Sequence, residues 1–133
     1  MSAADLPADA GPPADRNALD RVRAICLSLP EAFEQAAWGE PTFRVRKKIF
    51  AMHASAGTHH GRGRDGLWCA APVGVQQMLV RARPDAYFIP PYVGVKGWIG
   101  IHIDAVDDAE LRGLIIQSYC RIAPRKLQAL VED

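Results

Sequence analysis

Hydrophobic positions along the chain follow both the helical and the strand period, which predicts a domain that mixes helices and strands. The first periodic stretch is helical and runs from Asp15, a predicted N-cap, to Pro30, with mostly charged residues on its other side. It predicts an amphipathic helix that packs one face on a sheet. The apolar residues of that face are Leu19, Val22, Ile25, Cys26 and Leu29.

Two segments with strand alternation follow, Thr42–Arg46 and Ile49–Ala54, and the short Lys47–Lys48 link predicts a hairpin. Between the helix and the hairpin, residues 31–41 contain a Gly-Glu-Pro turn and predict a connector. We expect the large aromatic side chains of this connector, Phe33 and Trp38, to fill the edge of the core.

The second half of the chain predicts further elements in alternation. The small, polar and glycine-rich residues 55–65 predict a flexible loop. The Asp107/Glu110 pair resembles a capping box at the start of a long helix, which continues to Pro124. The remaining predicted elements are a strand at 67–71, a helix at 75–82, a strand at 98–103 and a last amphipathic piece at 127–131.

Together these elements predict an α+β fold, a two-layer sandwich of an antiparallel sheet with helices on one face. The expected order is α-β-β-β-α-β(β)-α-α, with one or two strands at the sixth place. Residues 87–104 stand out, because prolines, glycines and aromatic residues crowd a turn that leads directly into a strand. Any functional site is therefore expected near this aromatic turn.

Several motifs in this order resemble the MmcQ/YjbR family, and the resemblance covers roughly residues 17–131. The motifs are residues 28–32, 38–45, 48–51, 88–94 and 97–101. The resemblance implies a small α+β module like those of frataxin and of secretion chaperones, in a family often labelled DNA-binding. Members commonly have glycine where Lys47 stands, so the hairpin loop is expected to be longer or strained here.

The length of 133 residues allows one domain, at 15–133, and residues 1–14 have the composition of a disordered tail. The apolar runs are too short to span a bilayer and the first residues lack a signal-peptide pattern, so we expect a cytoplasmic protein without membrane partners.

Cys26, Cys69 and Cys120 lie far apart in apolar patterns and predict reduced core thiols.

The net charge is only +1, but the positive charge is concentrated. Residues 44–64 carry six basic groups and no acidic group, whereas residues 1–43 carry three basic and seven acidic groups. Such a balance argues against indiscriminate binding of nucleic acid, while a local basic patch can still attract an anion.

A first hypothesis is that the hairpin and the following loop bind the phosphate backbone of DNA. If Phe43 and Val45 point into the core, the arginines that alternate with them point outward and form a basic ridge. The predicted nucleic-acid contacts are Arg44, Arg46, Lys47, Lys48, Arg62, Arg64 and Lys96. Solvated basic residues without a ligand are the alternative.

The aromatic turn supplies possible stacking residues, Tyr87, Tyr92 and Trp98, beside Lys96. A structural role is the favoured interpretation of Tyr92 and Trp98, and Lys96 is the better functional candidate. The near-neutral total charge and the resemblance to chaperone-type folds support a second hypothesis, a chaperone-like module for a protein or small ligand without nucleic acid. The expected contact is an open sheet face or an apolar groove near Pro90 and Tyr92. The first hypothesis is preferred by a small margin.

The chain carries no recognised catalytic, metal-binding or nucleotide-binding motif, so we expect no cofactor, no metal and no enzymatic activity. His59 and His60 are adjacent, but two imidazoles in one loop cannot complete a metal site alone. The oligomeric state is expected to be a monomer or a weak dimer.

Overall fold

The computed structural model describes residues 14–131, with side chains from Ala18 onward, and the predicted tail therefore lies outside the described residues except for Ala14. Helix α1 spans Ala14–Cys26 and begins one residue before the predicted N-cap. It is followed by a six-stranded antiparallel sheet in the order β1-β2-β3-β4-β6-β5. The strands are β1 (Ala32–Ala37), β2 (Glu40–Val45), β3 (Lys48–Ala54), β4 (Gly66–Cys69), β5 (Tyr87–Phe88) and β6 (Ile99–His102).

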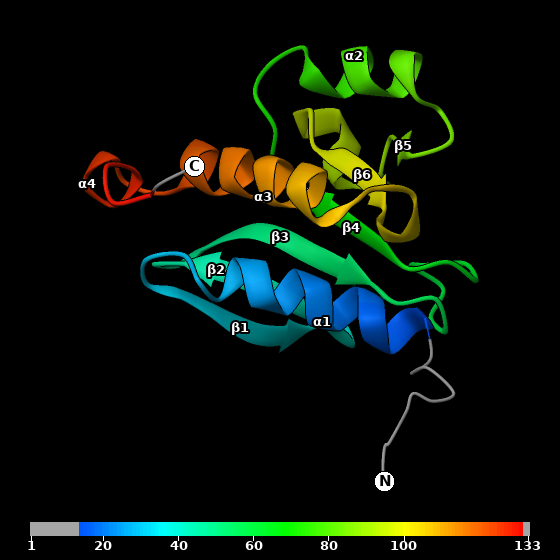
Figure 1. The fold of residues 1–133 in the computed structure, drawn as a ribbon, viewed down its shortest axis with the longest axis horizontal. Coiled ribbons are helices and arrows are strands. Elements are labelled where there is room, and N and C mark those ends of the chain that lie inside the picture. Colours follow the sequence, from blue (N-terminus) through cyan, green and yellow to red (C-terminus); the bar gives the residue numbers. More distant parts are fainter. Residues whose placement is uncertain (1–13, 132–133) are drawn as a thin grey trace, which may run out of the picture.

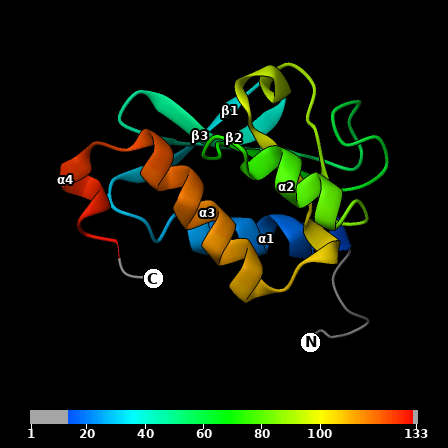
Figure 2. The same cartoon turned by 90° about the horizontal axis from the view of Figure 1, so that it is seen from above.

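The helices lie on one side of this sheet (Figures 1 and 2), as the two-layer α+β prediction requires. Helix α3 (Asp108–Ile122) crosses β3, and α1 lies beside it. Helix α2 (Val75–Ala82) covers the β5 edge, and α4 (Arg125–Gln128) is a short piece after Pro124. Two short 3₁₀ segments, η1 (Val93–Lys96) and η2 (Ile103–Ala105), flank β6.

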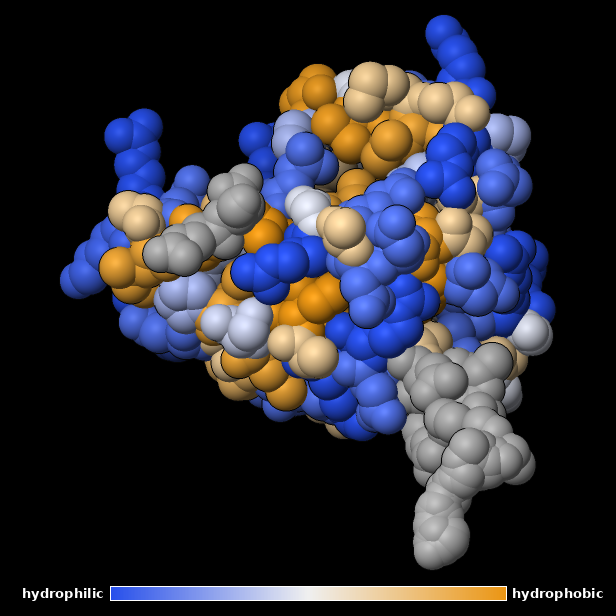
Figure 3. Space-filling view, viewed as in Figure 1, coloured by the Kyte–Doolittle hydropathy of each residue, from blue (hydrophilic) through white to orange (hydrophobic). Residues whose placement is uncertain are grey.

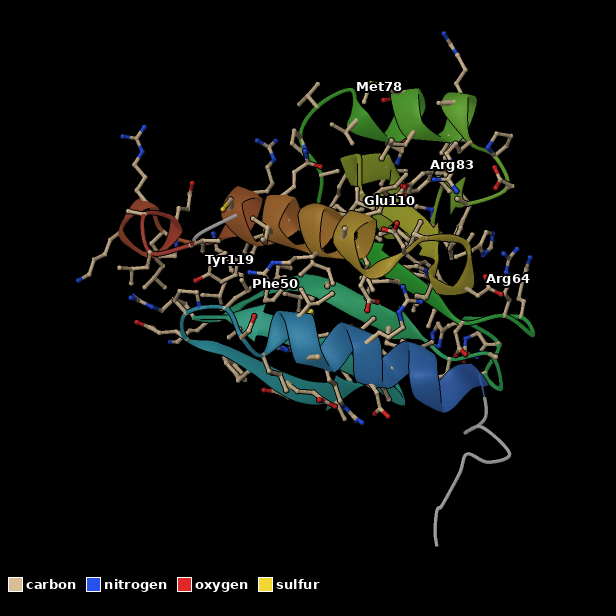
Figure 4. All side chains as sticks on the ribbon, in the orientation of Figure 1. Phe50, Arg64, Met78, Arg83, Glu110 and Tyr119 are labelled. Atoms are coloured by element: carbon tan, nitrogen blue, oxygen red, sulfur yellow. The ribbon has the colours of Figure 1, made fainter. Side chains whose placement is uncertain are left out.

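The main core fills the space between the sheet and the helices. Phe50 of β3 is fully buried and its ring meets that of Tyr119 of α3 edge-on, with centroids 5.5 Å apart (Figure 4). Phe43 and Val45 of β2 are buried in the same core, which confirms the prediction from their alternation. Cys26 and Cys69 are buried and Cys120 is partly buried, and no disulfide joins these three cysteines.

The start of α3 matches its sequence pattern in part. Asp107 caps the helix through Oδ1, which accepts a hydrogen bond of 2.8 Å from the backbone N–H of Glu110. The Glu110 carboxylate does not close the capping box, because it accepts hydrogen bonds from Arg83 and Tyr87 instead (Figure 4). This contact ties α3 to the β5 edge of the sheet.

The prediction of a connector at 31–41 is wrong, because residues 32–37 form the edge strand β1, paired with β2 from Ala32↔Val45 to Ala37↔Glu40. A tight turn joins the two strands, with φ of 56° at Trp38 and 76° at Gly39, the type I′ conformation that hairpins favour. Trp38 and Phe33 are 68% and 40% exposed, so neither fills the core. Alanine, glutamate and glutamine have little preference for strands, so residues 32–37 form a strand because β2 offers them a pairing partner.

The β2–β3 hairpin is short, since Val45 pairs with Lys48 and leaves Arg46 and Lys47 as the turn. The left-handed position is Arg46, with φ of 57°, rather than Lys47. Of the two expectations for the hairpin loop, a longer loop or a strained one, the structure shows the strained one, with the strain at Arg46.

The view from the helix side shows hydrophobic atoms over α2, at the top of the molecule (Figure 3). Met78 on this helix is exposed and contributes to this hydrophobic surface (Figure 4). In the described part of the chain, no helix has the length and apolar character needed to cross a bilayer.

Candidate ligand-binding site

The candidate site lies on the face of the sheet opposite α1 and α3, which we call the open face. Met52 of β3 pairs with Trp68 of β4, and these side chains form, with Ala54, a small buried cluster separate from the main core. The partly buried residues packed against this cluster are Phe88, Val93 and Trp98. The open face is therefore covered by the aromatic turn and by a loop, and not by helices.

Phe88 lies flat against the sheet because two glycines leave room for its ring. A Cβ built on Gly100 would lie 2.3 Å from the Phe88 ring, and one on Gly66 would lie 3.3 Å from it. The same ring also contacts the imidazole of His102, with centroids 4.6 Å apart. The glycine at 100 thus serves the close approach of a side chain to the backbone.

The loop of residues 55–65 is anchored by a buried carboxylate. Glu40 at the start of β2 is 1% exposed and accepts hydrogen bonds from the backbone N–H and Oγ of Ser55, from Oγ1 of Thr58 and from Nδ1 of His60. Asp65 accepts a further hydrogen bond of 2.9 Å from the backbone N–H of Ala56. The segment predicted to be a flexible loop is therefore held at both ends by carboxylates.

The hydrogen bonds to Glu40 also determine its charge. Burial would raise the pKa of this carboxyl, but the donors on Thr58, Ser55 and His60 outweigh it, and the pKa of Glu40 is lowered from its ordinary value. Glu40 is therefore ionised at neutral pH and attracts the ring N–H of His60. This places the imidazoles of His60 and its neighbour His59, with centroids 4.0 Å apart, over the open face.

A cavity of about 620 Å³ lies between this loop, the β1–β2 turn and the aromatic turn. Its volume is within the range of small-molecule sites, which is ~300–1,000 Å³. All of its lining residues except Met52 and Val93 carry an aromatic or imidazole ring. The lining residues are Trp38, Met52, His59, His60, Trp68, Tyr92 and Val93.

A second cavity of about 550 Å³ adjoins the first and shares His59, His60 and Tyr92 with it. Its walls are more polar, since Arg62 and Arg64 of the loop and His102 of β6 belong to it. Burial, and then the positive charge of Arg64, lower the pKa of His102, which is therefore neutral at pH 7. No aspartate or glutamate is among the described residues that line either cavity.

Three wall residues have a strained backbone. Trp38, Arg62 and Tyr92 have φ of 56°, 53° and 64°, a region that side chains other than glycine rarely enter. Tyr92 is the centre of a γ-turn in which the N–H of Val93 donates to the carbonyl of Pro91 at 2.6 Å, the rarer and strained kind of γ-turn. Such strain concentrates at functional sites, where it presents side chains that a relaxed turn would not.

The comparisons with known proteins agree with the fold. The profile of the YjbR family matches residues 27–121, which is more than half of the chain. The chain belongs to the YjbR family. The fold of this chain is similar to the crystal structure of Deinococcus radiodurans protein DR2400, which has a DUF419 domain. The TM-score is 0.69 and the sequence identity is 17%, and the match covers 84% of this chain and 86% of that chain. No curated protein matches the sequence.

In this YjbR domain the predicted basic contacts do not form one surface. The turn with Lys47 lies at one end of β3 and the loop with Arg62 and Arg64 at the other (Figure 1), and seven strand residues span roughly 20 Å. Arg46 pairs with Glu31 at 2.7 Å and Arg64 with Asp104 at 2.8 Å. The ridge from Arg44 through the lysines is thus separate from the loop that follows it in sequence.

The remaining predicted contacts lie outside the cavities. Arg44 lies on the open face and donates from Nε to Oγ1 of Thr42 at 3.0 Å. Lys96 is exposed in η1 and lines neither cavity. Lys47 and Lys48 are exposed at the hairpin.

The predicted stacking residues have three different environments. The prediction for Tyr87 is wrong, because its ring is 2% exposed in the main core and its hydroxyl donates to Glu110. Burial, and then this carboxylate, raise the pKa of Tyr87 well above its ordinary value. Tyr92 is 76% exposed and lines both cavities, which contradicts the structural role favoured for it, while Trp98 is partly buried against the open-face cluster.

Most of the cavity wall is not evident from sequence reasoning. The sequence predicts Trp38 in the core, and it gives His59 and His60 no role, since two imidazoles in one loop cannot complete a metal site alone. Among the described residues, no group of three or more histidines, cysteines or carboxylates is placed to hold a metal ion. One part of the wall has a local signal in the sequence. Gly39 tolerates positive φ, so Trp38-Gly39 could have been read as a turn that exposes Trp38.

Proposed function

We propose that this YjbR domain binds a small, flat and largely apolar ligand on the open face of its sheet. The observation that carries the proposal is the cavity of about 620 Å³ walled by Trp38, Trp68, Tyr92 and the adjacent imidazoles. Ligand sites are typically concave and aromatic with few polar groups, and this cavity has that character.

The exposure of the wall residues supports the proposal. Trp38 and Tyr92 leave 68% and 76% of their surface open, although burial of a large aromatic ring is favourable. Both also adopt strained backbone conformations. A ligand ring between them would bury this apolar surface, which the domain alone leaves exposed to water.

The proposal is for binding without catalysis. Among the described residues that line the two cavities, none is a serine, cysteine, aspartate or glutamate, so the imidazoles of His59, His60 and His102 have no such nucleophile beside them to activate. The buried carboxylate of Glu40, beneath His60, is occupied by donors of the loop.

The test is a fluorescence titration with the neutral probe N-phenyl-1-naphthylamine. Binding to the wild-type domain should saturate with one site, and Trp38→Ala and Tyr92→Ala should each raise Kd at least about fivefold, because each removes one aromatic wall. Phe33→Ala is the matched control, since Phe33 is an aromatic residue of β1 that is 40% exposed and does not line the cavity. Equal binding by all four proteins, or no saturable binding, would overturn the proposal.

A second candidate function is DNA binding through the β2–β3 hairpin. One observation favours it: Lys47 and Lys48 are exposed, and neither side chain forms an ion pair or hydrogen bond within the part of the chain that the structure describes. Phosphate contacts of this type give affinity without sequence preference. The separation of the hairpin from Arg62 and Arg64 makes this candidate the weaker one.

The hairpin is tested by fluorescence anisotropy with single-stranded and double-stranded DNA over a salt series. Lys47→Glu/Lys48→Glu should strongly weaken binding and reduce the slope of log K against log salt by about 0.9 for each phosphate that the hairpin no longer neutralises. The control is Arg125→Glu/Lys126→Glu on α4, which changes the charge equally at another exposed site. If both double variants weaken binding alike, the hairpin is not the DNA site.

A further inference from the structure

The two cavities of the open face are neighbours with different chemistry. They share Tyr92 and the two imidazoles of the loop, so a ligand that fills the apolar cavity has the second cavity beside it. The first is walled by rings and Met52, whereas the second contains Arg62 and Arg64. A ligand long enough to enter both would need an apolar part and a polar part.

The charge of the second cavity is positive. Among the described residues, its lining contains two guanidinium groups and no carboxylate. Arg64 is already paired, with Nε and Nη2 both donating to Oδ1 of Asp104 at 3.1 and 2.8 Å. For the side chain of Arg62 no hydrogen bond or ion pair is found between residues 18 and 131, so its five donors remain available.

Arg62 is presented by an ordered turn. Its own backbone N–H donates to the carbonyl of Thr58 at 3.1 Å, and the N–H of Gly63 donates to that of Ala56 at 2.9 Å. Gly61 packs so closely that a Cβ would lie 2.1 Å from the carbonyl oxygen of Ser55. Because two buried or partly buried carboxylates anchor the same loop, the guanidinium is attached to a fixed backbone beside the cavity.

The walls also hold unsatisfied polar atoms. His102 Nδ1 is buried and has no hydrogen-bond partner among the described residues, and Trp68 Nε1 is in the same state. A buried polar group without a partner is unfavourable by ~1–3 kcal/mol. Trp68 lines the apolar cavity and His102 lines the second, more polar one.

We propose that the ligand is a small aromatic anion, with its ring in the apolar cavity and its carboxylate, sulfonate or phosphate at Arg62. The planar guanidinium can bind such a group through two parallel hydrogen bonds, and Arg64 adds a second positive charge. This inference rests on the proposed function, because the anion site alone would be an open surface.

The test compares two probes that share the phenylaminonaphthalene rings and differ in charge. 1-Anilinonaphthalene-8-sulfonate carries a sulfonate, and N-phenyl-1-naphthylamine is neutral. Arg62→Gln should raise Kd for the sulfonate at least about tenfold and for the neutral probe less than about twofold, and Arg62→Lys should retain part of the affinity. Arg121→Gln, an equal charge change on the exposed side of α3, should alter neither value.

The outcomes separate the two levels of the proposal. If Arg62→Gln leaves both affinities unchanged or weakens both equally, the anion site is wrong and the apolar site stands. If neither probe binds the wild type, the proposed function fails and the inference with it. Thermal melting of each variant in the absence of probe should agree with the wild type, which shows that a change in affinity does not come from unfolding.

Discussion

The two faces of the sheet are built differently. On the helix side, β3 contributes Phe50 and Ala51 to the main core, which α1 and α3 cover. On the open side, the same strand contributes Met52 to a cavity wall covered by turns and a loop. The first face is the source of most apolar burial. The second contains the buried carboxylate of Glu40 and the strained wall residues Trp38, Arg62 and Tyr92.

This difference indicates that the helix-covered face mainly stabilises the fold and that the open face is suited to binding a ligand. Apolar residues that are fully packed between layers have little freedom to contact a ligand. Residues on turns with positive φ contribute less to packing, and their side chains remain accessible. Substitutions on the two faces should therefore separate in their effects, as the following predictions specify.

The largest effect is expected for Phe50→Ala. Phe50 is fully buried and packed edge-on against Tyr119, so the substitution leaves a large void in the main core. We expect the free energy of unfolding to fall by ~3–5 kcal/mol, measured by chemical denaturation. Phe33→Ala on the exposed edge strand should lower it by less than ~1 kcal/mol, and similar values for both variants would contradict the division between the faces.

Gly100→Ala should be the most destabilising small change on the open face. Its Cβ would lie 2.3 Å from the Phe88 ring, so the ring must move off the sheet, and the free energy of unfolding should fall by ~1–3 kcal/mol. The same substitution at Gly113 of α3 meets nothing within 4 Å and should stabilise by ~0.5–1 kcal/mol. Thermal melting that moves both variants in the same direction would contradict this packing.

Glu40→Gln should lower stability at neutral pH by ~1–3 kcal/mol, since several hydrogen bonds to a charged carboxylate are weakened. The pKa of folded Glu40 is lowered, so its contribution is complete above the ordinary value of 4.5 and disappears as the pH falls through the folded value. The difference in melting temperature between wild type and variant should therefore shrink from pH 7 to pH 3.

The matched control for this carboxylate is Glu34→Gln on the edge strand β1. Glu34 is partly exposed and bound to Arg23 at 2.8 Å, so its substitution should lower stability by less than ~1 kcal/mol. Limited proteolysis gives an independent measurement, because only the Glu40 variant should expose the loop of residues 55–65. Equal protection of that loop in both variants would show that Glu40 does not anchor it.

The smallest effect has the opposite sign. Trp38→Asn should stabilise the domain by ~0.5–1 kcal/mol, because asparagine tolerates the φ of 56° and Asn-Gly is the preferred type I′ turn. The same variant should bind the neutral naphthylamine probe more weakly, since a wall of the cavity is removed. A variant that is less stable and binds unchanged would show that Trp38 serves the fold.

Much of the fold was predictable from local patterns. The helical period of residues 19–29 and the alternation around Phe43 and Val45 each identified the face that is buried. The pattern around Asp107 located the start of α3. These predictions succeed because the period of apolar residues reflects one continuous core on one side of the sheet.

The edge strand β1 and the site were less predictable. Residues 32–37 have no apolar alternation, and they are a strand because the backbone of β2 offers them a partner. Tyr87 and Tyr92 occur in one aromatic segment, yet one is buried in the main core and the other is exposed. Whether each tyrosine ring is buried or exposed depends on the direction that the chain takes around Pro90 and Pro91. That direction is fixed only when the sheet has assembled.

Local period and motifs were enough to establish the α+β class, the antiparallel strands, the helix-covered face and the membership in the YjbR family. The meeting of Trp38, His60 and Tyr92 around one cavity, with Glu40 bound to His60, was settled in three dimensions alone. These residues come from three segments that are distant in the chain. Their meeting depends on strand register and on turns with positive φ, neither of which leaves a periodic signal in the sequence.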